Sequence, residues 1–268
     1  MRNDHINLRE LGIAVLAPVC MVLVQDCISA AVQLLYKDNR DTGIPVSLLS
    51  YTAIIFIAAY LYFGKGEKKH AEKKQAPALR VFLIFILLFI AGVSLQFFST
   101  GILNIIDMYR PELLSSYKAM VKSSFSLDNG ILRVFTVMLI APVGEELVFR
   151  GLSLRSFQRA FSFKHSNAAA IFASALLFGL FHGNLVQFCY ALPAGILLAL
   201  LTIWTSALLP SVFLHMIINI SSYAINLSGF TSLSPAAIIS LTIASGVICA
   251  VIFLLLYRML KLPPYRKS

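Results

Sequence analysis

The chain has 268 residues, of which 59% are hydrophobic and 13% are charged, and its mean hydropathy is +0.83. A soluble fold of this composition would have too little polar surface to stay dispersed, so the composition excludes a soluble protein and indicates an integral membrane protein. Nucleic-acid binding would require basic residues interleaved with aromatic ones. The lysine-rich stretch 65–74 is better explained as a loop beside anionic lipid, so we expect a bilayer and no nucleic-acid partner.

Apolar runs of about 20 residues predict an all-α, polytopic fold with about eight transmembrane helices. The longest hydrophilic connections, at about 64–80 and 107–129, are short for a separate soluble domain, so we expect one integral membrane domain over residues 1–268. The expected spans are 11–35, 44–63, 81–106, 131–150, 168–184, 185–206, 208–227 and 236–257.

The basic residues favour one side of the membrane. With the N-terminus in the cytoplasm, the inner segments hold 16 of the 22 lysines and arginines, among them those of 65–74 and a loop that begins at Arg150. This bias predicts that both termini are cytoplasmic. We expect the protein to lie in a bacterial cell membrane.

The first polar motif within an apolar run is Glu145-Glu146-Leu-Val-Phe-Arg150. Glu146 and Arg150 are four residues apart and face each other on a helix, so they can form an ion pair. Glu145 lies about 100° around the helix without that partner, which suits a general base. Pro142 and Gly144 would loosen the helix where water must enter. The alternative is that both acids extend toward cytoplasmic basic residues.

The second motif is Phe178-Gly179-Leu-Phe-His182. A lone histidine in an apolar helix is more often a packed, hydrogen-bonded residue, but two such histidines together with an intramembrane glutamate favour a site. Phe178, one turn before His182, either walls that site or makes an ordinary packing contact. Gly179 and Gly183 form a GxxxG pattern, which allows a neighbouring helix to approach His182 closely.

The third motif is His215-Met-Ile-Ile-Asn219. Its two polar residues are four positions apart and share one helical face. Stacked donors of this kind can hold the oxygen of a carbonyl as it becomes an oxyanion. They can equally act as polar contacts that hold helices together in a membrane.

In this order, the three motifs resemble those of the CAAX prenyl-protease and bacteriocin-processing family of intramembrane endopeptidases, often called CPBP or Abi proteins. The family pattern is EExxxR, FxxxH and HxxxN, and every position is present within 131–227. The resemblance implies that Glu145 and His182 activate a water molecule. It also implies that His215 and Asn219 stabilise the tetrahedral intermediate, in a catalytic cavity open to the cytoplasm.

Two mechanisms stay open. Glu145, His182 and His215 could supply three zinc ligands and leave a fourth position for water. The sequence has no HExxH pair, however, and the two histidines come from separate expected helices, so we favour a metal-free, glutamate-dependent hydrolase without a cofactor.

The substrate expected for such an enzyme is a membrane-associated peptide or protein, such as a prenylated tail, a peptide pheromone or a bacteriocin. The alternative from another class is a non-enzymatic membrane partner, such as an immunity protein or a scaffold. A transporter is a more distant alternative, because no repeat symmetry is visible. The sequence carries no signal for an oligomeric state.

The expected helix ends place the candidate residues at different depths in the membrane. Counted from the inner ends of their spans, His182 lies about 20 Å deep, His215 about 10 Å and Glu145 about 7 Å. A tilted or broken helix would be needed to bring these side chains together.

Overall fold

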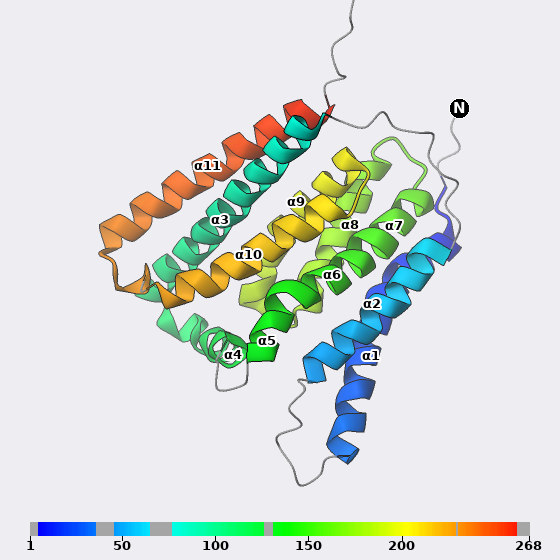
Figure 1. Ribbon diagram of the computed structural model, residues 1–268, viewed down its shortest axis with the longest axis horizontal. Coiled ribbons are helices and arrows are strands. Elements are labelled where there is room, and N and C mark those ends of the chain that lie inside the picture. The colour runs from blue at the N-terminus through cyan, green and yellow to red at the C-terminus, as the bar shows by residue number, and fades with distance from the viewer. Residues whose placement is uncertain (1–4, 36–45, 65–76, 126–130, 229, 262–268) are drawn as a thin grey trace, which may run out of the picture. The chain divides into compact units, whose positions relative to one another are not determined.

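The computed structural model describes residues 5–35, 46–64, 77–125, 131–228 and 230–261, which form helices α1–α11 (Figure 1). Among these residues the only β-type pairing is one isolated bridge, between Ile6 and Phe161. The prediction of an all-α fold is confirmed. The chain divides into two compact units, the first made of residues 1–68 and 120–200 and the second of 69–119 and 201–268.

Five helices of the described residues are long and apolar enough to cross a membrane. The prediction of an integral membrane protein is therefore confirmed, whereas the count of about eight spans stays a prediction. The loop 65–74 lies outside the described residues, so the orientation of the termini also stays a prediction. The five helices are α1 (Leu8–Leu35), α2 (Val46–Gly64), α3 (Ala78–Tyr109), α9 (Leu185–Thr205) and α11 (Pro235–Lys261).

In the first unit, one irregular helical path carries the first motif. It comprises α5 (Ile131–Phe135), a π-helical segment Thr136–Ile140, α6 (Ala141–Glu146), a second π-helical segment Leu147–Leu154 and α7 (Arg155–Ala160). Pro142 lies in the first turn of α6. Proline has no N–H to donate to the preceding turn, and π-helical turns are a common way for a helix to accommodate such a gap.

The prediction that this helix ends near residue 150 is wrong, because the path continues to Ala160. Arg150, which the charge count places in a cytoplasmic loop, is completely buried. A buried arginine is tolerated inside apolar helices only when it is paired, and the partner of Arg150 lies one turn away. The charge of Arg150 therefore gave the wrong boundary.

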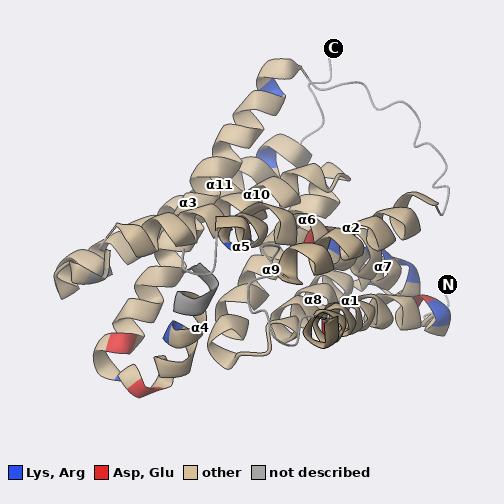
Figure 2. Ribbon diagram, turned by 60° about the horizontal axis from the view of Figure 1, so that its bottom comes forward, with Lys and Arg blue, Asp and Glu red and all other residues tan. Residues whose placement is uncertain are grey.

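Three helices of the first unit surround this path. Helices α1 and α2 pack against each other and against the second π-helical segment, which α8 (Ser166–Phe181) also contacts. Figure 1 shows α1 and α2 side by side next to α6 and α7. Figure 2 shows a negatively charged segment on α6 amid helices that carry few charges. The first motif thus lies at the centre of the first unit.

The second unit is built on α3, which packs against both α10 (Leu209–Leu227) and α11. A Cβ atom at Gly92 of α3 would come within 2.7 Å of the Ile217 side chain, and one at Gly246 of α11 within 2.8 Å of Phe98. Small residues at helix interfaces let backbones approach closely in membranes. Close helix packing at glycine therefore organises this unit.

Candidate active site

Arg150 and Glu146 form an ion pair at the centre of the first unit. The Arg150 Nη1 atom lies 2.8 Å from Glu146 Oε1, and neither side chain has any exposed surface. The Arg150 Nη2 atom donates a second hydrogen bond to the backbone oxygen of Gly195, and the guanidinium carbon lies 4.3 Å from the centre of the Phe178 ring. The predicted pair is confirmed, and it ties α6 to α8 and α9.

Glu145, the neighbouring carboxylate, is also buried, with 7% of its surface exposed. Since both acids are buried, the alternative that they extend toward basic residues of an exposed cytoplasmic segment is wrong. The Tyr51 hydroxyl of α2 donates a hydrogen bond of 2.7 Å to Glu145 Oε1. The two adjacent carboxylates thus accept hydrogen bonds from different donors: Glu146 from the Arg150 guanidinium and Glu145 from the Tyr51 hydroxyl.

Tyr51 is the residue that sequence reasoning missed. It lies 94 residues before Glu145, within an apolar run, and belongs to no motif. The signal that could have found Tyr51 is the group of hydroxyl-bearing residues in this run, which also includes Ser47 and Ser50. Gly144 has a clearer role than loosening the helix: a Cβ there would lie 3.1 Å from the Tyr51 ring, so the glycine lets this ring approach α6.

His182 lies at the C-terminal cap of α8 and is partly buried. Its Nδ1 atom is 2.8 Å from the backbone oxygen of Phe178. Because a carbonyl oxygen can only accept, Nδ1 carries the hydrogen, and in the neutral ring Nε2 is then the nitrogen with the lone pair. This tautomer suits a group that orients a water molecule.

Phe178 connects the ion pair to the imidazole. Its ring lies under the Arg150 guanidinium and meets the His182 ring edge to face, with centroids 4.9 Å apart. The GxxxG interpretation is right for Gly179 only, because a Cβ there would lie 2.9 Å from Phe188 of α9. Gly183 instead has a positive φ of 65° and open space around it, so it ends α8.

The longer helical path of the first motif reduces the apparent difference in depth between Glu145 and His182. From Glu145 to the end of α7 at Ala160, and from His182 back to the start of α8 at Ser166, the chain rises by similar lengths, roughly 22 and 24 Å. The two helices are held together by a hydrogen bond of 2.9 Å from the Ser174 hydroxyl to the Phe149 backbone oxygen. Both candidate residues therefore lie at the same end of this helix pair.

His215 and Asn219 lie on α10 in the second unit, four residues apart as predicted. His215 is buried, with 6% of its surface exposed, and Asn219 is partly buried. That these two residues form one site with Glu145 and His182 stays a prediction. Among the described residues, no three His, Cys, Asp or Glu side chains are grouped closely enough to hold a metal ion.

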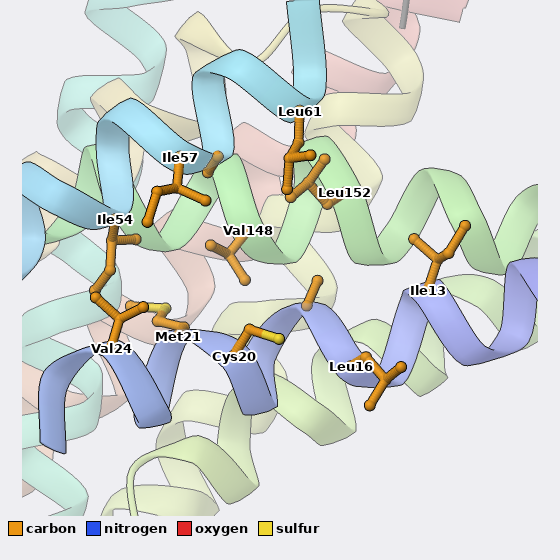
Figure 3. A pocket seen from close by; sticks show the side chains of 12 residues that line it. Ile13, Leu16, Cys20, Met21, Val24, Ile54, Ile57, Leu61, Val148 and Leu152 are labelled. Atoms are coloured by element: carbon orange, nitrogen blue, oxygen red, sulfur yellow. The ribbon is translucent and has the colours of Figure 1, made fainter. Parts of the chain in front are cut away.

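An apolar pocket of about 270 Å³ lies beside the site in the first unit. Figure 3 shows side chains of α1, α2 and the second π-helical segment pointing toward one another around it, among them Cys20, Ile54 and Val148. Ile54 is one turn from Tyr51 on α2, and Val148 is one turn from Glu145. Two residues that line the pocket thus lie one helical turn from Tyr51 and from Glu145, which do not line it themselves.

The first unit thus holds a buried carboxylate, a buried ion pair and a hydrogen-bonded imidazole among the helices of an integral membrane protein. Residues 127–221, roughly a third of the chain, match the family described as type II CAAX prenyl endopeptidase, Rce1-like. The match contains all three motifs, and it confirms the resemblance drawn from them. No curated protein and no solved structure matches the chain.

Proposed function

We propose that this protein is an intramembrane endopeptidase that hydrolyses a peptide bond in a membrane-associated peptide or protein. The observation that carries the proposal is the pair of adjacent buried carboxylates that accept hydrogen bonds from different donors. Arg150 holds Glu146, whereas Glu145 meets the neutral Tyr51 hydroxyl. A second carboxylate in apolar surroundings costs free energy, so a chain that retains one uses it. General-base chemistry suits an endopeptidase, which is how the matching family is described.

In the proposed reaction, Glu145 takes a proton from a water molecule that His182 orients. The water oxygen attacks the carbonyl carbon of the peptide bond and forms a tetrahedral intermediate. When the C–N bond breaks, Glu145 returns the proton to the departing amine nitrogen. Glu146 and Arg150 take no part in these transfers, and they keep α6, α8 and α9 in place.

The oxyanion of the intermediate is assigned to His215 and Asn219. One helical turn separates them on one face of α10, which suits two donors aimed at one developing charge. This assignment requires that His215 and Asn219 reach the same substrate carbonyl as Glu145 and His182, in a cavity open to the cytoplasm.

The substrate is proposed to carry a hydrocarbon group. The pocket beside the site is lined by apolar side chains of α1, α2 and the second π-helical segment, and it would accept part of such a group. A C-terminal Cys that is prenylated supplies hydrocarbon next to peptide bonds, in agreement with the description of the matching family.

A metal-free mechanism is proposed in preference to zinc. The structure places His182 at the end of α8 and His215 within α10, so the two histidines lack the one-turn spacing of the usual helical zinc motif. The lone pair of His182 Nε2 would suit either role. If zinc were bound, Glu145, His182 and His215 would be its ligands, and the metal would lower the pKa of the bound water.

The test uses purified protein in lipid vesicles and an internally quenched peptide that ends in a farnesylated Cys, two aliphatic residues and a final residue. We expect the wild type to cleave this peptide and Glu145→Gln to lose activity by about 10²–10⁴-fold with little change in folded yield. The matched control is Asp26→Asn, because Asp26 is an exposed carboxylate on α1. It should behave as the wild type.

Two results would contradict the proposal. Near-normal turnover by Glu145→Gln would remove Glu145 from the mechanism. The second result is a wild type without any cleavage activity. It would leave this peptide intact, and N-terminal sequencing of membrane proteins from cells that express it would find no new cleavage site. That result would favour the non-enzymatic partner.

A further inference from the structure

A chain of three polar side chains from three helices ends on the candidate base. The Gln25 side chain of α1 interacts with that of Tyr51 of α2, and the Tyr51 hydroxyl donates a hydrogen bond to Glu145 Oε1 at 2.7 Å. Gln25 and Tyr51 are both partly buried, in helices composed almost entirely of apolar residues. Polar groups in such surroundings are retained for structure or for function.

The backbone is shaped to permit this contact. Gly144, immediately before Glu145, lies under the Tyr51 ring, and an added Cβ would come within 3.1 Å of that ring. Contacts this close require the neighbour to move by a few tenths of an ångström. A side chain at position 144 would therefore displace the ring whose hydroxyl reaches the carboxylate.

The hydrogen bond constrains how Glu145 can act. The terminal torsion of a glutamate side chain is broad, so an unrestrained carboxylate samples many orientations. A hydroxyl that donates to one carboxylate oxygen limits this rotation, and charge-assisted hydrogen bonds of this kind are stronger than neutral ones. Since proton transfer depends on the orientation of the base, a restrained carboxylate reacts more often.

We propose that Tyr51 is a positioning residue for the general base Glu145, supported in turn by Gln25. The Tyr51 hydroxyl holds Oε1, so the proton of the attacking water passes to Oε2 and later returns from Oε2 to the departing amine, while Tyr51 keeps its own proton. This inference rests on the proposed function, because it assigns a role within the same reaction.

The test measures kcat and KM in vesicles with the farnesylated quenched peptide. Tyr51→Phe removes one hydroxyl and keeps the ring, and we expect kcat to fall by about 10- to 100-fold, the loss typical of a hydrogen bond to a charged group. KM should stay within about two-fold, because no contact with the substrate is removed. Gln25→Leu acts on Glu145 only through Tyr51 and should lower kcat by a smaller factor.

Tyr60→Phe is the matched control, because Tyr60 lies on the same helix and is 77% exposed. It should retain the kcat of the wild type. The thermal unfolding temperature of each variant in detergent is measured beside the kinetics. A structural role for Tyr51 would lower this temperature, whereas a positioning role lowers kcat in a protein of unchanged stability.

The outcomes separate this inference from the proposed function. A wild-type kcat in Tyr51→Phe together with an inactive Glu145→Gln would overturn the inference and leave the proposed function standing. Full activity in both variants, or no hydrolysis by the wild type, would overturn both. If Tyr51→Phe yields no folded protein, Gly144→Ala tests the same contact from the other side, and an unchanged kcat in that variant would reject the inference.

Discussion

The two units of the chain bury different kinds of side chain. Among the described residues, the buried charged side chains are Glu145, Glu146 and Arg150, all in the first unit. They lie on a path that alternates between α- and π-helix. In the second unit, α3, α10 and α11 are long α-helices with close contacts at glycine. Regular helices are sufficient for packing, whereas irregular helices with buried charge indicate function.

Arg150→Leu should lower the stability of the first unit more than any other substitution proposed. The substitution leaves Glu146 buried without its cation, which costs about 3–5 kcal/mol, so folded yield and unfolding temperature in detergent should fall sharply. The matched control is Arg159→Leu on the same helical path. The Arg159–Glu10 pair is partly exposed, and pairs of that kind contribute about 0–1 kcal/mol.

The double variant Arg150→Leu with Glu146→Leu sharpens this result. Replacing both members of a buried pair by apolar side chains is often neutral, so the double variant should recover much of the lost stability. A double variant no more stable than Arg150→Leu would show that the hydrogen bond to Gly195 and the contact with Phe178 matter more than the charge of Glu146.

Asn219→Ala tests whether the second unit also takes part in catalysis. Loss of one oxyanion donor should lower kcat by about 10²–10³-fold with little change in KM. Asn226→Ala is the control, since Asn226 is exposed on the same helix. Equal activity in both variants would limit the second unit to a structural role.

Gly92→Ala should destabilise the second unit without a direct effect on the chemistry. The added methyl group would lie 2.7 Å from the Ile217 side chain, and overpacking of this kind costs about 1–3 kcal/mol. Gly12→Ala in α1 is the control, because nothing lies within 4 Å of a Cβ there. A Gly92→Ala protein with wild-type unfolding temperature would mean that α3 and α10 can separate slightly at no cost.

Zinc removal should have the smallest effect. Under the proposed mechanism, activity survives exhaustive treatment with zinc chelators, and elemental analysis of active protein gives well below one zinc ion per chain. Stoichiometric zinc whose removal abolishes activity, and whose return restores it, would reject the metal-free mechanism. His182→Ala and His215→Ala would then lose the metal together with activity.

The sequence by itself determined the membrane class, the all-α fold and the Glu146–Arg150 pair. These features depend on composition or on neighbours within one helical turn, so spacing along the chain is sufficient to predict them. The order of the three motifs likewise carried the family resemblance, which the match over residues 127–221 confirms.

Only the tertiary structure decided which other side chains reach the candidate base. Tyr51 meets Glu145 because α1, α2 and α6 pack together across 94 residues of chain, and no local pattern encodes such a contact. The helix boundary at Ala160 could not be predicted for a related reason. An arginine is typical of a loop, and only the structure reveals the buried partners that allow it to lie inside a helix. Contacts between distant helices thus fixed the surroundings of the carboxylate.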